Sequence, residues 1–488
     1  MGTASSGEWI AILLYFALVI GVGVYFFFRD RNVEGEKEYF LGGRSMGGWV
    51  AALSAGASDM SAWVLMGLPG SIYLYGIGKV WIAVGLVIGT ICAWVFVAPR
   101  LRRYSIRAND SITIPQFLTN RFLSKNKGLQ IISAIVFVVV YCIYSASSIS
   151  ACGTLFNTVT GMSAKTAMII ATAIILVYVF LGGFNAVCWT DFFQGMIMLA
   201  ALLLAPIFAL ALVGQGEGAA NGQLPEGFFH LFTTPQDVIS GLGWGLGYFG
   251  MPHIIIRFMS IKSEKELRKS SVIGISWTVI ILVMSALTAV AGRLYLGEIQ
   301  DSSTVFITMV RRIFPALVSG LLLSAILSAA MSTADSQLLA ASSAFASDVY
   351  KPLIRKNASD KEMLWASRLV VMAISVVALL IASNPNSGSI MGLVENAWGV
   401  FGAAFGPVIL LSLFWKKLTF SGTVAGIAVG AGVDVLWLIL AKSATGIYEI
   451  VPGFFAGLLA AWLVSALDKK GPGAQVEALF DEASKPGL

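Results

Sequence analysis

The chain has 488 residues, of which 57% are apolar and only 12% are charged, and its mean hydropathy is +0.83. This composition excludes an ordinary soluble domain and indicates an all-α polytopic membrane protein. The net charge of +6 belongs mainly to the connections between apolar segments, so it does not indicate nucleic-acid binding.

Apolar runs of about 17 to 25 residues predict about thirteen transmembrane helices in a lipid bilayer. The predicted starts lie near Trp9, Gly48, Ile77, Leu129, Lys165, Trp189, Asp237, Ser271, Pro315, Leu364, Ile390, Thr419 and Glu449. No positive charge precedes the first run, so we expect span 1 to remain in the mature protein rather than act as a cleaved signal peptide.

The basic residues predict the orientation of these spans. Of the 32 Lys and Arg residues, 26 follow spans 1, 3, 7, 9 and 11 or lie in the tail, if the connection after span 7 begins at Arg257. Because such residues concentrate in cytoplasmic loops, we predict a plasma-membrane protein with its N-terminus outside and its C-terminus in the cytoplasm.

Two spans contain enough glycine and proline to weaken a continuous helix. They are SAGASDMS at 54–61 in span 2 and GLGWGLGYFGMP at 241–252 in span 7. Because they lie five spans apart, spans 2–6 and 7–11 must enter the membrane from opposite sides, which is the geometry of an inverted repeat. The alternative is that the glycines only permit close helix packing.

The predicted division of the chain follows from these breaks. Its segments are a first helix and cytoplasmic loop (1–47), a first five-helix repeat (48–214), an extracellular loop (215–235), a second repeat (236–416), two peripheral helices (417–467) and a cytoplasmic tail (468–488).

Asp59 is the most informative residue of span 2. No basic residue lies between Arg44 and Lys79, and a carboxylate at the centre of a bilayer helix costs about 2.5 to 3.5 kcal/mol. Nearby serine hydroxyls and the carbonyl oxygens of an opened helix would suit a small hard cation. We interpret this segment as an ion site.

Span 9 carries a second polar group, formed by Ser328, Ser332, Asp335 and Ser336. Their spacing places them on one helix face. An isolated serine more often bonds to its own helix backbone, but four aligned polar groups favour a binding face. Asp191, at the predicted cytoplasmic start of span 6, is either part of a site or a favourable acid near a helix N-terminus.

Aromatic residues accompany the break in span 7. Trp244 and Tyr248 share one face, and Pro252 follows one turn later. Such rings line a core more often than a substrate pocket, and the same holds for Tyr144 in span 4. Two further intramembrane acids, Glu395 and Asp434, have no polar neighbours in the sequence and are left unassigned.

The sequence contains no metal-binding cysteine or histidine pattern and no nucleotide-binding or hydrolase motif. We therefore expect no enzyme activity and no organic cofactor. An ion gradient is the energy source that remains.

Several runs resemble the sodium/solute symporter family, and most of all its proline-transporting members. They are LGGRS at 41–45, ALSAGASDMS at 52–61, GWGLGYFGMPH at 243–253 and MST at 331–333. The likeness covers roughly residues 36 to 467. It implies a leucine-transporter-like five-plus-five inverted repeat, and uptake of L-proline driven by sodium through alternating access.

The resemblance also implies roles for single residues. Sodium would be held by the carbonyls of Ala57, Met60 and Ala329 and the hydroxyls of Ser332 and Thr333, with Asp59 in support. L-Proline would contact Ser61, Tyr144, Trp244, Tyr248 and Pro252. Arg44 would serve coupling and inward release.

Two positions depart from the family pattern. Ala62 stands where the proline members have glycine, and Asp335 stands where the family more often has serine. Because some relatives hold a second sodium at the equivalents of Asp191, Ser332, Asp335 and Ser336, we expect a second cation or proton site at these residues.

Two other functions remain open at this point. One is a symporter of the same family that carries another small solute or uses protons. The other is an ion channel, whose flux would be passive and would not saturate with an organic solute.

Overall fold

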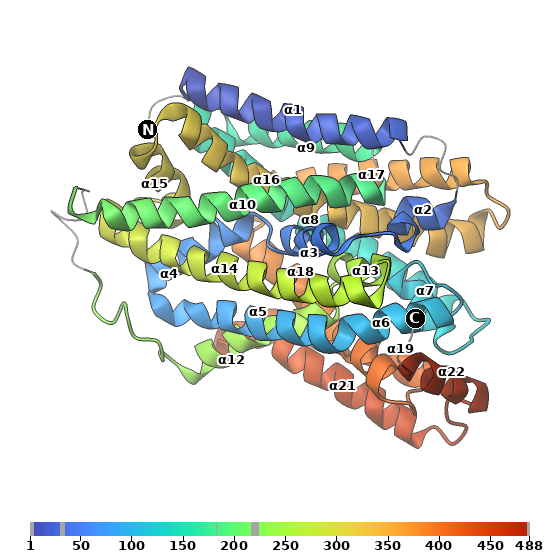
Figure 1. Cartoon of the computed structure of the whole chain (residues 1–488). Coiled ribbons are helices and arrows are strands. Elements are labelled where there is room, and N and C mark those ends of the chain that lie inside the picture. Colours follow the sequence, from blue (N-terminus) through green and yellow to red (C-terminus); the bar gives the residue numbers. More distant parts are fainter. Residues whose placement is uncertain (1–3, 30–34, 182, 216–223, 486–488) are drawn as a thin grey trace.

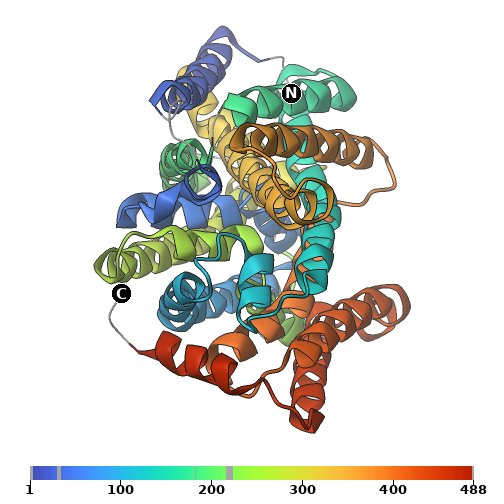
Figure 2. The ribbon, with the colours of Figure 1, turned by 90° about the vertical axis from the view of Figure 1, so that its right-hand side faces the viewer.

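The computed structural model describes residues 4–29, 35–181, 183–215 and 224–485. Within them the regular structure is helical, apart from one isolated bridge between Met46 and Ile261. The helices run mostly along one axis, as seen from the side in Figure 1 and end-on in Figure 2. The all-α prediction is confirmed.

Ten helical segments are long and apolar enough to cross a membrane. They are α1 (Ser6–Arg29), α5 (Trp81–Cys92) with its continuation through η4 (Ala93–Val97) into α6 (Ala98–Arg107), α8 (Gly128–Thr160), α10 (Phe184–Ala211), α14 (Glu264–Leu296), α16 (Ala316–Ala344) with its continuation into η8 (Phe345–Ile354), α17 (Asp360–Ala382), α18 (Ile390–Phe414), α19 (Phe420–Leu440) and α21 (Ile450–Leu467).

The other three predicted spans are short or interrupted. They are α3 (Gly48–Asp59) followed by η2 (Ala62–Val64) and α4 (Gly67–Tyr75), then α9 (Ala164–Leu181), and α12 (Pro235–Gly243) followed by η6 (Trp244–Phe249) and α13 (Pro252–Ser260). The two interrupted segments are those in which the sequence predicts a break. The total of thirteen spans stays a prediction.

Short helices cover the ends of the bundle. They are α2 (Glu36–Leu41), η1 (Gly42–Arg44), η3 (Ile77–Val80), α7 (Ile114–Asn120), η5 (Val213–Gln215), η7 (Ser302–Thr304), α15 (Val305–Ile313), α20 (Lys442–Thr445) and α22 (Ala474–Ser484). The predicted tail is largely folded, because Phe480 of α22 packs edge-on against Tyr104 with ring centroids 6.1 Å apart.

The helix with the predicted polar face is central. Every residue of α16 from Leu322 to Ala344 is buried. By contrast, α1 lies at one edge of the bundle and α19 and α21 at the opposite edge (Figure 2). Apolar side chains on these outer helices, such as Leu13 and Leu440, are exposed as expected for a surface covered by lipid.

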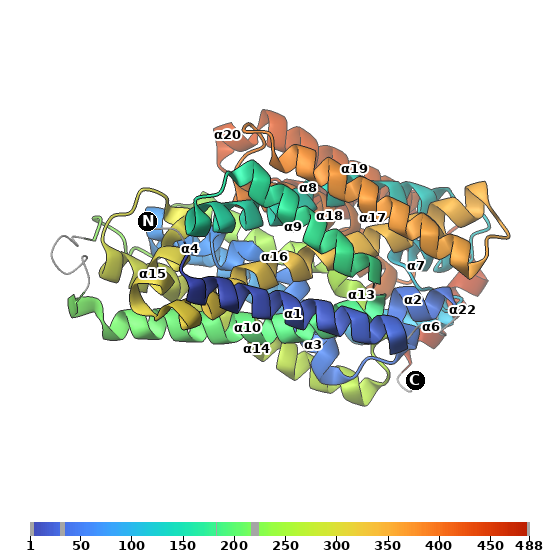
Figure 3. The ribbon, with the colours of Figure 1, turned by 90° about the horizontal axis from the view of Figure 1, so that it is seen from above.

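The two chain ends lie at opposite ends of the bundle (Figures 1 and 3). The C-terminal end also carries α2, α6, α7 and α22, which together with their connections contain many of the Lys and Arg residues. One basic residue was wrongly assigned to a loop: Arg257 lies within α13 and is 1% exposed. Arg31 and residues 216–223 of the predicted loop 215–235 lie outside the described residues.

Close backbone packing joins α5 to the interrupted segment of the second repeat. A Cβ on Gly89 would stand 2.3 Å from the carbonyl oxygen of Gly245, and one on Gly245 would stand 2.3 Å from that of Gly85. Since backbone atoms cannot rotate away as a side chain can, only glycine fits at this crossing. The close-packing explanation of the span 7 glycines therefore holds at Gly245.

We predict that Gly89→Ala destabilises the protein by about 1 to 3 kcal/mol, the usual cost of overpacking. Gly432→Ala is the matched control, because a Cβ on Gly432 meets nothing within 4 Å. Thermal unfolding of the purified variants would measure both effects. Equal melting temperatures for the two variants would contradict the close crossing.

Candidate functional site

The first break opens the backbone of α3 beside α16. Helix α3 ends at Asp59, and Ser61 has φ +21°, a value that residues with side chains rarely adopt. The last carbonyls of a helix lack an intrahelical donor, so the carbonyl of Ala57 is open to another partner. Met60 caps this end of α3 and is fully buried.

That partner comes from α16. The hydroxyl of Ser332 lies 2.9 Å from the carbonyl oxygen of Ala57 and 3.3 Å from that of Ala329. The neighbouring Thr333 hydroxyl is buried and has no hydrogen-bond partner among the described residues. Residues predicted to hold sodium from two distant parts of the chain thus meet at one point.

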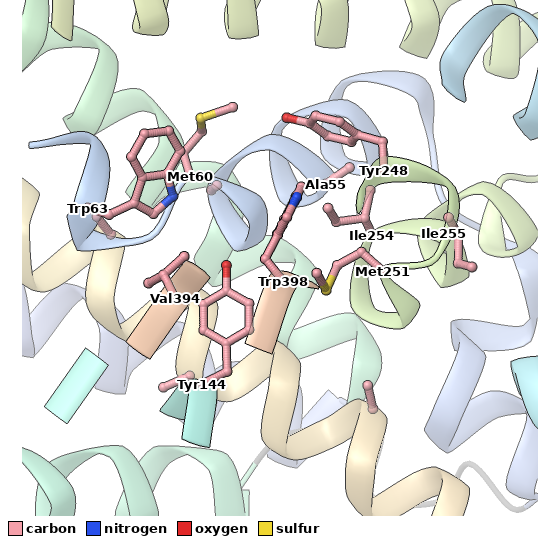
Figure 4. Close-up of a cluster of buried hydrophobic side chains, with 14 of the residues drawn as sticks. Ala55, Met60, Trp63, Tyr144, Tyr248, Met251, Ile254, Ile255, Val394 and Trp398 are labelled. Atoms are coloured by element: carbon pink, nitrogen blue, oxygen red, sulfur yellow. The ribbon is translucent and has the colours of Figure 1, made fainter. Parts of the chain in front are cut away.

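Asp59 and Tyr248 are also brought together. The Tyr248 hydroxyl donates a hydrogen bond to Oδ2 of Asp59, and both side chains are 3% exposed. Figure 4 shows the Tyr248 hydroxyl directed towards α3. The carboxylate therefore has an uncharged donor as partner, and one contact links a predicted ion residue to a predicted substrate residue.

Aromatic rings surround the break in α3. Trp244 lies 6.0 Å from Trp63, 6.3 Å from Trp398 and 5.1 Å from Tyr448 between ring centroids. Tyr144 extends towards the same region in Figure 4, and its buried hydroxyl has no hydrogen-bond partner within the described chain. Four predicted substrate residues, Ser61, Tyr144, Trp244 and Tyr248, therefore belong to this neighbourhood.

Pro252 begins α13, where its missing N–H group costs no helical hydrogen bond. The next residue, His253, is fully buried and its backbone N–H donates to the Tyr141 hydroxyl at 3.0 Å. The second break is therefore a turn between η6 and α13. The start of α13 is held in place by Tyr141 of α8.

Sequence analysis did not identify three aromatic residues of this region: Trp63, Trp398 and Tyr448. The indole of Trp398 donates to the Trp244 carbonyl at 2.8 Å, and it fills the space beside Gly247. Tryptophans in long apolar spans carry no distinguishing pattern. The one local signal is Gly247, because a residue without a side chain leaves room for a large partner such as Trp398.

A buried ion pair occupies the predicted second cation site. Arg257 Nη2 lies 3.2 Å from Asp191 Oδ2 and 2.5 Å from the Ser336 hydroxyl, and Arg257 Nε lies 3.1 Å from Ser54. Asp335 borders the group, because Ser336 also reaches Asp335 Oδ1 at 3.2 Å. Asp191 is in the second turn of α10 and fully buried, so it is more than a first-turn acid.

Arg44 connects three segments at the C-terminal end of the bundle. It donates to Asp110 at 3.0 Å, to the carbonyl of Ser111 at 2.8 Å and to the carbonyl of Met259 in α13 at 2.6 Å. Partial burial raises the pKa of Asp110, but the hydrogen bond from Lys37 and the charges of Arg44 and Lys37 outweigh it and leave this pKa below its usual value. The carboxylate is therefore a stable anchor for Arg44.

Two of the cavities lie at opposite ends of the bundle. One, of about 410 Å³, is lined by Met66 and Gly67, just after the first break, and by Met391 of α18. The other, of about 490 Å³, is lined by polar residues including Glu36, Gln130 and Lys351.

Comparison with known proteins identifies the family. The model of the sodium:solute symporter family matches residues 39–430. The high-affinity proline transporter PutP of Bacillus subtilis (strain 168) is 44% identical over 469 residues, which cover 94% of this chain and 98% of that protein. The chain belongs to the sodium:solute symporter family.

A second relative agrees with this assignment, and one solved structure has a similar fold. The osmoregulated proline transporter OpuE of Bacillus subtilis (strain 168) is 42% identical, over 94% of this chain and 95% of that protein. The structure of a sodium-coupled sialic acid symporter in a substrate-bound outward-open state has a TM-score of 0.79 at 19% identity, and the match covers 96% of this chain and 99% of that one.

These comparisons confirm the predicted fold class and the predicted kind of protein. The chain is a multi-pass membrane transporter with a leucine-transporter-like fold, and it is not an enzyme. As a member of this family it is coupled to sodium.

We predict that Arg257→Gln and Asp191→Asn are each strongly destabilising, because removing one partner of a buried ion pair costs about 3 to 5 kcal/mol. The double variant should lose less stability than the two single losses combined, since neither charge then remains unpaired. Melting temperatures of the four proteins would measure this coupling.

Arg355→Gln is the control for that experiment. Arg355 forms an ion pair with Glu362, but its side chain is 62% exposed, so we expect a loss below about 1 kcal/mol. Strictly additive losses for Arg257 and Asp191 would contradict their pairing.

Proposed function

We propose that this protein couples the inward movement of sodium to the uptake of L-proline by alternating access. The observation that carries the proposal is the meeting of the Ser332 hydroxyl with the carbonyls of Ala57 and Ala329 at the opened end of α3. The two relatives named as proline transporters, both above 40% identity, support the choice of substrate.

Sodium would bind among the carbonyls of Ala57, Met60 and Ala329 and the hydroxyls of Ser332 and Thr333. Five oxygens suit a small hard cation. The Ser332 hydroxyl would rotate to present a lone pair to the ion, and the buried Thr333 hydroxyl would gain the partner that it lacks. Asp59 would support the ion electrostatically from the end of the same helix.

L-Proline would lie beside the ion between the two breaks, in contact with Ser61, Tyr144, Trp244, Tyr248 and Pro252. A zwitterion needs no charged side chain to balance it. Its carboxylate would face backbone N–H groups at the helix breaks, and its ring would pack on Trp244 and Tyr248. The contact between Tyr248 and Asp59 gives a direct route by which each ligand affects the affinity of the other.

The repeats at 48–214 and 236–416 would rock relative to each other once both ligands are bound. One positive charge moving inward releases about 2.3 kcal/mol per 100 mV, enough to concentrate a neutral solute roughly fiftyfold. Arg44 would act in coupling and release, because it ties the loop before α3 to the end of α13.

We propose that the protein lies in the plasma membrane with its N-terminus outside and its C-terminus in the cytoplasm. The support is the charge pattern, in which most of the basic residues follow spans 1, 3, 7, 9 and 11 or lie in the tail.

A second cation or proton site at Asp191, Ser332, Asp335 and Ser336 remains a proposal of its own. The Arg257 guanidinium already lies against Asp191 and Ser336, so a further cation would have to bind mainly on the Asp335 side. Asp335→Ser should then lower the number of cations transported per proline. An unchanged stoichiometry and pH dependence of uptake would exclude a cation there.

The decisive test is binding of labelled L-proline to the purified protein with and without sodium. We expect binding that requires sodium and is displaced by unlabelled proline. Thr333→Val keeps the shape of the side chain but removes one ligand, and should raise the sodium concentration needed by about tenfold or more.

Ser324→Ala is the matched control on the same helix, because among the described residues the Ser324 hydroxyl donates only to the carbonyl of Gly320 in its own helix. Its sodium requirement should stay unchanged. Displacement by another solute instead of proline would reassign the substrate, and proline binding that ignores sodium would overturn the proposal.

A further inference from the structure

A group of acidic side chains lies away from the proposed sodium and proline sites, where α18, α19 and α21 meet. Asp434 of α19 is fully buried, and neither of its carboxylate oxygens has a hydrogen-bond partner among the described residues. Glu449, directly before α21, is also fully buried. A dry carboxylate without a partner is strongly disfavoured in its charged form.

The side chains of Asp434 and Glu449 approach the same place. A Cβ on Gly399 of α18 would lie 2.9 Å and 3.3 Å from the two carboxylate oxygens of Asp434, and 3.3 Å from Cγ of Glu449. The side chains are therefore neighbours across the face of one glycine. Two buried carboxylates on neighbouring side chains resist being ionised together.

The remaining charged and titratable groups around the pair are Glu395, Lys442 and Tyr448. Lys442 Nζ lies 2.8 Å from Glu449 Oε2 and 3.1 Å from Glu395 Oε1, so it is shared between two acids. With all groups ionised, three carboxylates would face one ammonium group, an excess of two negative charges. Burial raises the pKa of Glu449, although the contact with Lys442 opposes this rise.

A proton fits this site better than a metal ion. A hard cation is held by several oxygen ligands, whereas the residues that pack against Asp434 include Gly399 and Gly453, which have no side-chain oxygen to offer. No group of three or more metal-binding side chains occurs in the part of the chain that the structure describes. A proton needs only one acceptor and one neighbour with which to share it.

We propose that Asp434 and Glu449 hold one proton between them and so form a proton-binding site at the junction of α18, α19 and α21. Half-buried Lys442 and Glu395 lie between the pair and the surface, and provide the route by which the proton exchanges with water. The ligand is a proton from the aqueous phase, and no other reactant is required.

The site is connected to the aromatic region around the α3 break. Tyr448 is the residue before Glu449; its ring packs against Trp244, and its hydroxyl donates to the Glu395 carbonyl at 2.8 Å. Loss of the proton would place a second negative charge directly beside this residue. Proton occupancy is thus linked to the packing of Trp244.

The test compares the melting temperature of the wild type with that of Asp434→Asn between about pH 6 and about pH 9, with a non-metal salt as the only electrolyte. A folded state that holds a proton which the unfolded chain would release loses stability as pH rises. We expect the wild type to fall by several degrees across this range and the variant, which cannot lose a proton there, to fall less.

Glu395→Gln is the matched control, because it neutralises the acid of the group that lies nearer the surface but leaves the pair intact; its curve should follow the wild type. Infrared spectra near neutral pH should show a protonated-carboxyl band that Asp434→Asn lacks. If Asp434→Asn does not fold, Glu449→Gln replaces it, because Asp434 then has no acidic neighbour and the fall should again be smaller.

The proposal would be overturned if the pH curve of Asp434→Asn, or of Glu449→Gln where it replaces that variant, ran parallel to the wild-type curve. It would also be overturned if the variant kept the carboxyl band. A difference between wild type and variant that appears only when sodium is added would also overturn it, since the ligand would then be a metal ion. None of these measurements uses proline, so failure here is distinct from failure of the proposed symport.

Discussion

The meeting of α3 and α16 is the constraint on which the rest of the molecule depends. Helix α3 stops in the middle of the bundle and leaves carbonyl groups without helical donors, a state that lipid would not tolerate. The Ser332 hydroxyl supplies a partner for Ala57, and Tyr248 supplies one for Asp59. Both partners come from the second half of the chain, so the broken helix is stable only when the two halves are assembled.

Burial of charge follows the same rule throughout the interior. Arg257 and Asp191 neutralise each other and are held by the hydroxyls of Ser54 and Ser336. Arg44 is nearly as buried and uses two backbone carbonyls in addition to Asp110. Each such group connects helices that are far apart in sequence. The polar contacts in the interior therefore specify which helices are neighbours. Uniformly apolar helix surfaces would not distinguish one neighbour from another.

Much of this was predictable because the underlying signals are local. The apolar runs define the spans, and all of their predicted starts fall near helix starts, with the largest offset at Ser271, where α14 begins at Glu264. The two breaks were visible as glycine and proline within otherwise continuous apolar runs. Ser332 and Asp335 could be recognised because helical periodicity places them together.

The errors concern residues whose role depends on partners distant in sequence. Arg257 follows an apolar stretch and precedes a basic one, so hydropathy alone places it in a loop. Only the fold shows that α13 continues past it and delivers it to Asp191. Trp398 and Tyr448 are ordinary aromatic residues in or beside apolar spans until α18 and α21 are packed against η6. Likewise, Asp434 has no polar neighbour in sequence but lies beside Glu449 across Gly399.

The glycine crossing between α5 and η6 restricts how this transporter can change shape. Gly85 and Gly89 touch the backbone of Gly245 with no side chain between them, so neither element can slide along the other without steric collision. The part of the second interrupted helix that contains η6 must therefore move together with α5 as one rigid block. Relative motion has to be absorbed outside this crossing, and the nearest residue with an extended backbone is Met251, which separates η6 from the restart of the helix at Pro252. Met251 lies between the aromatic residues of η6 and Arg257 in the chain.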